Sequence, residues 1–361
     1  MRADIRVFDG QFNFLGEVSD YEEFVLTKRL TMFGEFQIAI NYDKANARLF
    51  EVGNFIYLDS ERSGIIDHVE RRLGGASDKG ESLFVKGFTP EHILTYRITY
   101  PPSWADAWSR VSQGESVIKP LVQNNMGSAS EYANRIIPSV HYAPSLGRGR
   151  IVFFHTAYKK LHEEVSTLAI LSGLGIKMTM EPEAKRFLFD VFVGRDLSSA
   201  QTNVPPVIFS SEYDNVFSQC YTESRINYKN VAIVGTMERG MTGGVAYIGD
   251  QNSGKMRREL FVPGNDIPAG QIQQQVERGN ARLSERGYVR TLDGVINPHH
   301  SLKYREDYKL GDIVTMKYDD IMLHTPITEV TEKWTAKNGY GLAMTFGNRV
   351  PTLIDKIKQD I

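Results

Sequence analysis

The two ends of the chain carry the same succession of short strand patterns, and this repeat constrains the fold more than any other feature of the sequence. VGNFIYLD, GIIDHVERR and GESLFVKGF near the start correspond in order and rough spacing to LGDIVTMK, PITEVTEKW and NGYGLAMTFGN near the end. The aligned segments are Val52–Ile56 with Leu310–Val314, Ile65–Val69 with Pro326–Val330, and Leu83–Phe88 with Leu342–Gly347. Chance is the alternative, because short strands flanked by glycine are common. We predict that the chain contains a duplicated β-unit.

The first copy has the features of a small antiparallel barrel. In Glu35–Ile40, apolar residues at Phe36, Ile38 and Ile40 alternate with Glu35 and Gln37, which is the period of a half-buried strand. Asp9-Gly10 fits a tight hairpin turn, because glycine tolerates positive φ. Several short strands at close spacing, with a turn signal between them, predict a barrel or sandwich.

Between the two copies, the pattern predicts helices and strands together. Tyr100-Pro101-Pro102 and Pro205-Pro206 bound this region, because consecutive prolines end regular pairing. The spacing of apolar residues predicts a short or kinked helix over 114–125, around Pro120, and a helix over 158–175 that Gly173 can cap. Further on, Val231–Val234 is assigned to the start of the second barrel, and 241–256 to a mobile hairpin loop. Residues 268–287 give the best helix, with Pro268 in its first turn and Gly287 ending it.

These observations predict a β-rich α+β fold with two similar small antiparallel β-barrels and two inserted α+β domains. The expected units are a first barrel at 1–95, an α+β insert at 96–205, a second barrel at 206–240 with 295–350, a small insert with a hairpin loop and a helix at 241–294, and a C-terminal tail at 351–361.

Composition narrows the class of protein. The chain has 361 residues, 41% hydrophobic and 24% charged, which is ordinary for a soluble globular protein. A net charge of −2 gives no overall basic field for nucleic acid. One cysteine, Cys220, excludes an intrachain disulfide and a cysteine-cluster metal site. The charged start MRADIRVFDG is not a signal peptide, and no apolar run approaches the length of a membrane span. We expect synthesis and folding in a cytoplasm.

Histidines and acids do not form a recognisable catalytic or metal-binding pattern. His162 is followed by Glu163 and Glu164, but LHEEV lacks the second histidine of a zinc peptidase helix, so a solvated helix face is expected. His155 lies seven residues away. His299-His300 is expected in a turn, because adjacent residues on an extended chain point apart.

The remaining candidates also favour structural roles. Cys220 has no helix N-terminus or basic neighbour to lower its pKa. Asp9 and Asp319-Asp320 fit turns, and Gly74-Gly75, Gly243-Gly244 and GLGIK at 173–177 lack the lysine or the helix direction of a phosphate loop. Arg148 and Arg150 are too few to indicate nucleic-acid binding. We therefore predict no catalytic, cofactor-binding or metal-binding residues, and no enzyme.

A family resemblance lies in the same strand patterns. IRVFDGQFNFLGEVSDYEEF, TKRLTMFGEFQIAI, LFEVGNFIYLD and GIIDHVE resemble the opening of the tail-hub proteins of long-tailed phages of Gram-positive hosts. These tail-associated proteins share a fold with the central hub of contractile-phage baseplates. The resemblance is clear over the first quarter of the chain and loose beyond it. It carries no active site.

The resemblance implies a trimeric structural hub at the tip of a phage or prophage tail, assembled in the bacterial host cytoplasm. Three chains with two barrels each would place six barrels on a six-fold tail-tube ring. The implied partners are the distal tail or tail-tube ring protein, the tape-measure protein, and receptor-binding or baseplate proteins, with DNA passing through the channel without specific binding. Relatives often continue into a cell-wall-degrading domain, which we do not expect after PTLIDKIKQDI.

Two other functions are alternatives. One is a tail-associated peptidoglycan hydrolase or peptidase, which the lack of a nucleophile–base or metal constellation argues against. The other is a carbohydrate-binding or receptor-binding module. Tyr100, Trp104 and Trp108 could line a sugar site, and they could equally lie in an interface or in the core.

Overall fold

The computed structural model describes residues 3–73, 80–235, 245–250, 252–264, 267 and 270–347. Within these residues, thirteen strands join one large sheet, and two three-stranded sheets and one two-stranded sheet lie beside it together with three α-helices. The predicted β-rich α+β fold is therefore confirmed.

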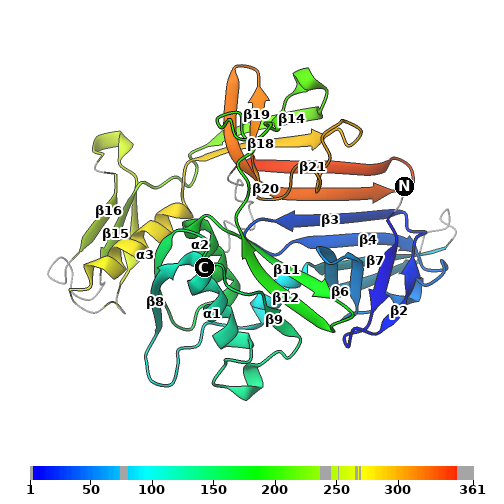
Figure 1. Cartoon of the computed structure of the whole chain (residues 1–361), viewed down its shortest axis with the longest axis horizontal. Helices are drawn as coiled ribbons and strands as arrows, with labels where there is room; N and C mark the ends of the chain where they lie inside the picture. The colour runs from blue at the N-terminus through cyan, green and yellow to red at the C-terminus, as the bar shows by residue number, and fades with distance from the viewer. Residues whose placement is uncertain are drawn as a thin grey trace.

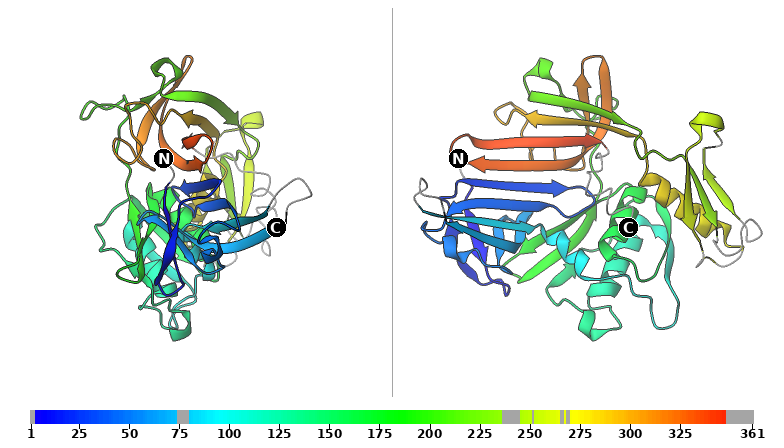
Figure 2. Two further views of the ribbon diagram at one scale, coloured as in Figure 1. Left: turned by 90° about the vertical axis from the view of Figure 1, so that its right-hand side faces the viewer. Right: turned by 180° about the vertical axis from the view of Figure 1, so that it is seen from behind.

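Two groups of strands build the large sheet (Figure 1). The N-terminal β-unit comprises β1 (Ile5–Phe8), β2 (Phe14–Val18), β3 (Glu23–Arg29), β4 (Glu35–Asn41), β5 (Phe55–Asp59), β6 (Arg62–Leu73) and β7 (Glu81–Phe88). The C-terminal β-unit comprises β13 (Ile208–Phe209), β14 (Val216–Ser224), β18 (Val289–Ile296), β19 (Ile313–Tyr318), β20 (Ile321–Thr335) and β21 (Gly339–Gly347). Figure 2 shows from behind how the two units stack edge to edge.

The two β-units share one strand order. Along the sheet, β3-β4-β7-β6-β5 of the N-terminal unit corresponds to β14-β18-β21-β20-β19 of the C-terminal unit. The pairing is interrupted at the same place in both, between Ile66 and His68 on β6 and between Ile327 and Glu329 on β20. These positions are the ones aligned in the sequence. The repeat is therefore present in the hydrogen-bond register as well as in the residues.

A glycine occupies the same position before β5 and before β19. Gly53 has φ 92° and Gly311 has φ 91°, a backbone region that glycine enters without the penalty of a Cβ. The Gly53 N–H donates to the carbonyl of Ile66 at 2.8 Å, and the Gly311 N–H donates to the carbonyl of Ile327 at 2.9 Å. The same turn thus introduces the equivalent strand of each unit.

An antiparallel pairing of β3 with β20 joins the units into one sheet. The register places Arg29 opposite Glu329 and Thr27 opposite Thr331. The Arg29 Nε lies 2.7 Å from a Glu329 carboxylate oxygen, and the two threonine hydroxyls are 2.9 Å apart. Two units that begin more than 100 residues apart in the chain therefore share one hydrogen-bonded surface.

The prediction of two closed barrels is wrong. Among the described residues no barrel closes, because β3 and β20 use the edges that closure would need to pair with each other instead. Alternating apolar residues specify which face of a strand is buried, but they do not specify which strand lies beside it. The division of the chain into units at the residue boundaries given above stays a prediction.

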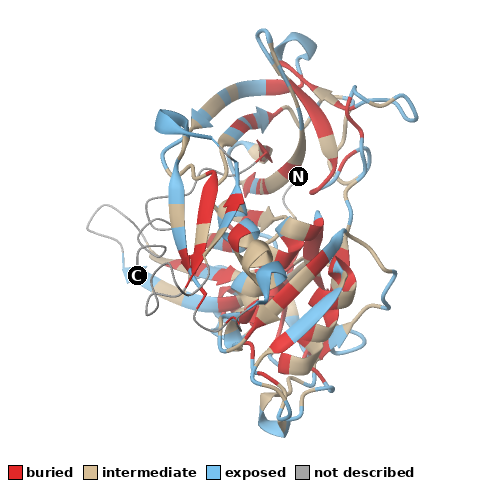
Figure 3. Ribbon diagram, turned by 90° about the vertical axis from the view of Figure 1, so that its left-hand side faces the viewer, coloured by how far each residue is buried: buried red, intermediate tan, exposed pale blue. Residues whose placement is uncertain are grey.

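Each β-unit buries one face of its strands. On β4 the burial alternates as predicted, with Phe36, Ile38 and Ile40 inside, and Figure 3 shows this alternation along the strands. Trp334 of β20 stacks on Phe24 of β3 with 5.0 Å between the ring centroids, so the C-terminal unit contributes to the N-terminal core. Burying such side chains stabilises the fold by about 1.5–3 kcal/mol each.

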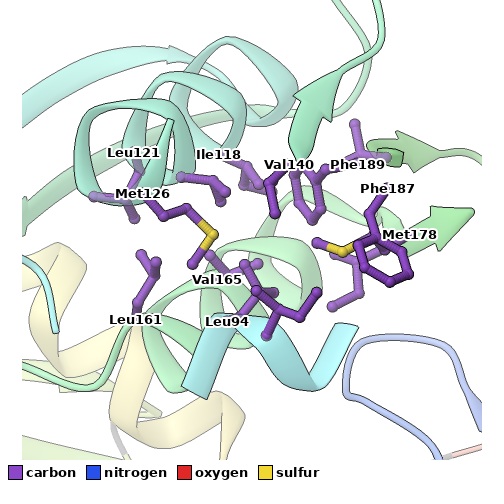
Figure 4. Close-up of a cluster of buried hydrophobic side chains, with 14 of the residues drawn as sticks. Leu94, Ile118, Leu121, Met126, Val140, Leu161, Val165, Met178, Phe187 and Phe189 are labelled. Carbon is purple, nitrogen blue, oxygen red and sulfur yellow. The ribbon is translucent and has the colours of Figure 1, made fainter. Parts of the chain in front are cut away.

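The α+β region between the units shares a core with the N-terminal β-unit, because Phe12 and Phe55 pack against Phe187 of this region. It contains β8 (Trp108–Gln113), α1 (Gly114–Met126), β9 (Val140–Tyr142), β10 (Ile151–Thr156), α2 (Leu161–Ser172), β11 (Gly175–Glu181) and β12 (Arg186–Phe192). Figure 4 shows Val165 of α2, Ile118 of α1 and Phe187 and Phe189 of β12 within one buried cluster. Gly173 ends α2 in the left-handed conformation, as predicted. Helix α1 continues through Pro120, so it is not short.

A third sheet with one helix follows β14. It consists of β15 (Val231–Gly235), β16 (Ala246–Gly249), β17 (Glu259–Pro263) and α3 (Ile272–Ser284). The assignment of Val231–Val234 to the second barrel is therefore wrong, because β15 pairs only with β16 and β17 in the described chain. Helix α3 ends at Ser284, before Gly287. Part of the loop predicted at 241–256 is strand β16; residues 241–244 and 251 lie outside the described residues.

The first hairpin turns differently from the prediction. The Asp9 carboxylate accepts hydrogen bonds from the backbone N–H groups of Gln11 at 2.8 Å and Asn13 at 2.9 Å. Phe12, rather than Gly10, takes the positive φ, of 64°. An aspartate side chain that satisfies two backbone donors makes a longer turn that does not depend on glycine.

Candidate functional site

The face of the large sheet that points away from the core, here the outer face, carries two equivalent shallow grooves. The first has a volume of about 490 Å³ and is lined by β3, β4, β6 and β7, with Glu23, Glu35 and Lys86 on its walls. The second has a volume of about 390 Å³ and is lined by β14, β18, β20 and β21, with Cys220 and Asp293 on its walls. These are corresponding strands of the two units, so the outer face repeats along the sheet.

Ion pairs neutralise several charges on the outer face. Arg29 lies 2.8 Å from Glu35 and 2.7 Å from Glu329, and Lys333 lies 2.7 Å from Glu23. The remaining groove charges include the carboxylates of Asp67 and Asp293. A surface in which cations are held by carboxylates lacks the excess positive charge that binds a phosphate backbone.

In the described residues, the edges of the large sheet that lack a strand partner include those of β14 and of the second half of β6, besides those of β2 and β13. β14 pairs with β18 on one side, and its other side has no strand partner. The stretch from His68 to Leu73 of β6 pairs with β7, whereas only the beginning of β6 pairs with β5. Such edges present backbone donors and acceptors to another strand. The edges of β14 and β6 are the equivalents of the two edges that β3 and β20 use to join the units.

A cluster of ion pairs holds the β5–β6 turn against the C-terminal β-unit. Arg62 lies 2.7 Å from Asp59 and 3.2 Å from Glu332, and Arg305 lies 2.8 Å from Asp59. The Tyr340 hydroxyl donates to Glu332 at 3.0 Å. Burial raises the pKa of Asp59, but the two guanidinium groups outweigh it and hold that pKa below its ordinary value. The cluster fixes the orientation of one unit on the other.

The candidate catalytic residues from the sequence do not converge. His155 of β10 makes a hydrogen bond of 2.6 Å with Ser109 of the neighbouring strand β8, and neither residue lines the grooves described above. His162 instead packs edge-on against the Phe33 ring. Glu163 lies 3.0 Å from Lys160, and burial raises the pKa of Glu164.

Several other candidates occupy turns or ion clusters. Asn297 accepts a hydrogen bond from the His299 N–H at 3.0 Å, which is the predicted turn. Asp319 has φ 51° in the turn between β19 and β20. Arg148 lies 2.7 Å from the fully buried Glu115. Gly74-Gly75 and Gly243-Gly244 lie outside the described residues. In the described parts of the chain, no three histidine, cysteine or acidic side chains are grouped to hold a metal.

The aromatic residues proposed for a sugar site separate. Trp108 is buried against Phe154, so it belongs to the core of the α+β region. Trp104 is 81% exposed. Tyr100 lies in an edge-to-face cluster with Tyr132 and Tyr158, at 4.9 Å and 5.4 Å between ring centroids. The structure thus does not gather the three residues named from the sequence.

A family model covers nearly the whole chain. The model of the family described as Siphovirus ReqiPepy6 Gp37-like protein matches residues 4–348. The chain belongs to this family. The resemblance to phage tail-hub proteins is thereby confirmed at the level of the family, and the match extends it from the first quarter to nearly the whole chain. No curated protein matches the chain in sequence.

Solved structures of tail proteins share the fold. The 43 kDa tail protein of prophage MuSo2 from Shewanella oneidensis is 12% identical with a TM-score of 0.57, covering 95% of this chain and 98% of its own. A tail protein from Neisseria meningitidis is 14% identical (TM-score 0.54; 95% and 96% covered). A prophage tail protein from Listeria monocytogenes is 11% identical (TM-score 0.55; 99% and 98% covered). Among the described residues of the chain, no helix is long and apolar enough to cross a membrane.

Proposed function

We propose that the chain is the structural hub at the tip of a phage or prophage tail, and that it works as a homotrimer. The duplicated β-unit is the observation that carries this proposal. A chain with two equivalent units makes six equivalent positions from three copies, so a three-fold molecule can meet a six-fold tail-tube ring. The hub adapts the symmetry of the tube to that of the tip.

The interface between copies is head-to-tail, with the N-terminal β-unit of one chain meeting the C-terminal β-unit of the next. A heterologous interface that closes after three copies gives a ring rather than a fibre. A permanent ring of this kind buries more than about 2,000 Å² in total at each interface. The open edges of β6 and β14 support this arrangement, because stable proteins cover such edges.

The proposed partners follow from the position in the tail. One end of the ring contacts the distal tail or tail-tube ring protein and the tape-measure protein, and the other carries receptor-binding or baseplate proteins. DNA passes through the ring without specific binding, and the ion-paired outer face supports this. The chain has a structural rather than an enzymatic role, in a virion assembled in the bacterial host cytoplasm.

The symmetry of the protein inside an assembled tail tip tests the proposal. Electron microscopy of tails that contain the chain is expected to show three copies around the tail axis, with their β-units at six equivalent angles. Any other copy number around that axis would refute the hub. Light scattering on the purified chain supplies a second measurement, with three times 40.8 kDa as the expected mass.

The wall-hydrolase alternative has one specific observation in its favour. Ser109 and His155 are hydrogen-bonded at 2.6 Å, which is the contact that a serine nucleophile and its histidine base require. If the chain degraded peptidoglycan, Ser109→Ala would abolish the activity while leaving the folded mass unchanged. We expect no turnover of purified cell wall by the native chain, measured by release of soluble muropeptides.

A further inference from the structure

We infer that residues His68–Leu73 of β6 pair as an antiparallel strand with β14 of the neighbouring copy, in the register that β20 makes with β3 inside one chain. The inference rests on the proposed trimer and assigns the strands and residues that join its members. It treats the junction within the chain as the template for the junction between chains.

The template is fixed by the correspondence of strands. β20 corresponds to β6 and β3 corresponds to β14, because the two units have one strand order. Within the chain, the second half of β20 pairs with β3. The equivalent half of β6 and the equivalent strand β14 lack that pairing in the described chain. The two open edges are therefore the two halves of one junction, and a second copy supplies the missing half of each.

The register follows from the pairs that flank the interrupted ladders. Pairing resumes at His68 on β6 and at Glu329 on β20. Val69 and Val330 are the next residues of the two strands, so they correspond. Gln37 of β4 and Asp293 of β18 are equivalent residues. Val25 lies opposite Gln37 and Cys220 lies opposite Asp293, so Val25 corresponds to Cys220. Lys333 faces Val25 within the chain. Arg72, the equivalent of Lys333, therefore faces Cys220 of the neighbouring copy.

The side chains on this register are compatible. Thr27 and Thr331 bond through their hydroxyls in the template; their equivalents Thr222 and Glu70 offer a hydroxyl donor and a carboxylate acceptor. Arg72 already lies against Glu70, at 2.8 Å, and Cys220 is exposed. No like charges face each other across these pairs, so the edges can approach without repulsion.

The positions of Arg72 and of Cys220 in the neighbouring copy lie close enough for a disulfide to join them when Arg72 is replaced by cysteine. In the template, the Leu30 N–H donates to the Thr328 carbonyl and the Ala336 N–H donates to the Glu22 carbonyl. Because hydrogen-bonded and non-hydrogen-bonded pairs alternate, Lys333 and Val25 form a non-hydrogen-bonded pair, with Cα atoms about 4.5 Å apart. A disulfide spans such a distance.

The test is the variant Arg72→Cys of the full-length chain, oxidised mildly at increasing protein concentration. Within one chain, six strands separate β6 from β14, on the order of 30 Å, so a disulfide between the two positions has to join two chains. We expect a product on a non-reducing gel that runs at three chains and grows no further, because the third link closes the ring. The double variant Arg72→Cys with Cys220→Ser is expected to remain uncrosslinked.

Arg71→Cys is the matched control. Its side chain points to the opposite face of the strand, so it should not capture Cys220. Equal cross-linking of the two variants would overturn the register. The junction would be overturned if Arg72→Cys failed to cross-link in a sample that light scattering shows to be trimeric. Failure to cross-link at every protein concentration would overturn it as well. A ladder that continues beyond three chains would keep the junction and refute the closed trimer, so the two proposals fail separately.

Discussion

The N-terminal and C-terminal β-units have the same strand order, but they differ in what covers their edges. The second half of β20 in the C-terminal unit pairs with β3 in the N-terminal unit. Their equivalents, β6 and β14, are open in the described residues. The difference shows that one chain completes only one of the two junctions that its repeat implies. It also provides matched positions, one covered and one open, at which the same substitution has different expected effects.

Trp334 and Leu73 are the first matched pair, and they carry the largest expected effect. Trp334 is 4% exposed and stacks on Phe24, whereas its equivalent Leu73 is 85% exposed. Trp334→Ala should lower the free energy of unfolding by about 3–5 kcal/mol through lost burial and a cavity. In a single chain, where Leu73 is exposed, Leu73→Ala should change the free energy of unfolding by less than about 0.5 kcal/mol. Urea unfolding of both variants measures this, and equal losses would contradict the comparison.

Gly311 and Gly53 have the same backbone conformation in different surroundings. A Cβ on Gly311 would meet Phe192 at 2.8 Å, whereas nothing lies within 4 Å of a Cβ on Gly53. Gly53→Ala should cost about 1–2 kcal/mol for the positive φ alone. Gly311→Ala adds overpacking, for a total of about 2–4 kcal/mol. Thermal unfolding of the two variants compares them, and a Gly53 variant that is the less stable one would reject the equivalence of the two turns.

The repeat was predictable because its signals are local. Gly53 and Gly311 mark equivalent turns, and the strands that follow each glycine repeat in order and rough spacing. The pairing of β3 with β20 was not predictable, because it joins residues 300 positions apart and an alternating strand carries no mark of its neighbour. Closed barrels were expected for that reason.

The candidate site was less predictable than the fold. An apolar run such as Val231–Val234 is typical of any buried strand, so it does not indicate which sheet the strand joins. The ion pair of Arg62 with Glu332 is not among the predicted features. A signal for it exists in the sequence, because a glutamate within an apolar strand is rarely buried without a partner. An open edge such as β14 has no sequence signature. It became visible only when the covered equivalent, β3, was known.

Glu332 and Arg71 form a third matched pair. Glu332 is buried and accepts from Arg62 and Tyr340, whereas its equivalent Arg71 lies at the surface beside Glu81. Glu332→Ala should lower the free energy of unfolding by about 1–3 kcal/mol, because two partly buried donors lose their acceptor. Arg71→Ala should have an effect below about 0.5 kcal/mol. Denaturant unfolding of both variants is the measurement, and a larger loss for Arg71→Ala would show that the covered junction is not the stronger one.

The smallest expected effect is the pH dependence of the contact between the units. Arg62 and Arg305 hold the pKa of Asp59 below its ordinary value of 3.8 despite burial. A carboxyl group whose pKa is lowered on folding stabilises the fold above its unfolded pKa. That contribution is lost as the pH falls through the folded pKa, because the unfolded state then binds the proton more readily. Asp59→Asn should therefore reduce stability at neutral pH and flatten the fall in stability below about pH 4. The midpoint of urea unfolding, measured from pH 7 to pH 3 for the native chain and the variant, tests this. The change to asparagine keeps the size of the side chain and removes only its charge. If the unfolding midpoint of the variant falls with pH in parallel with that of the native chain, Asp59 does not couple the two β-units through its charge.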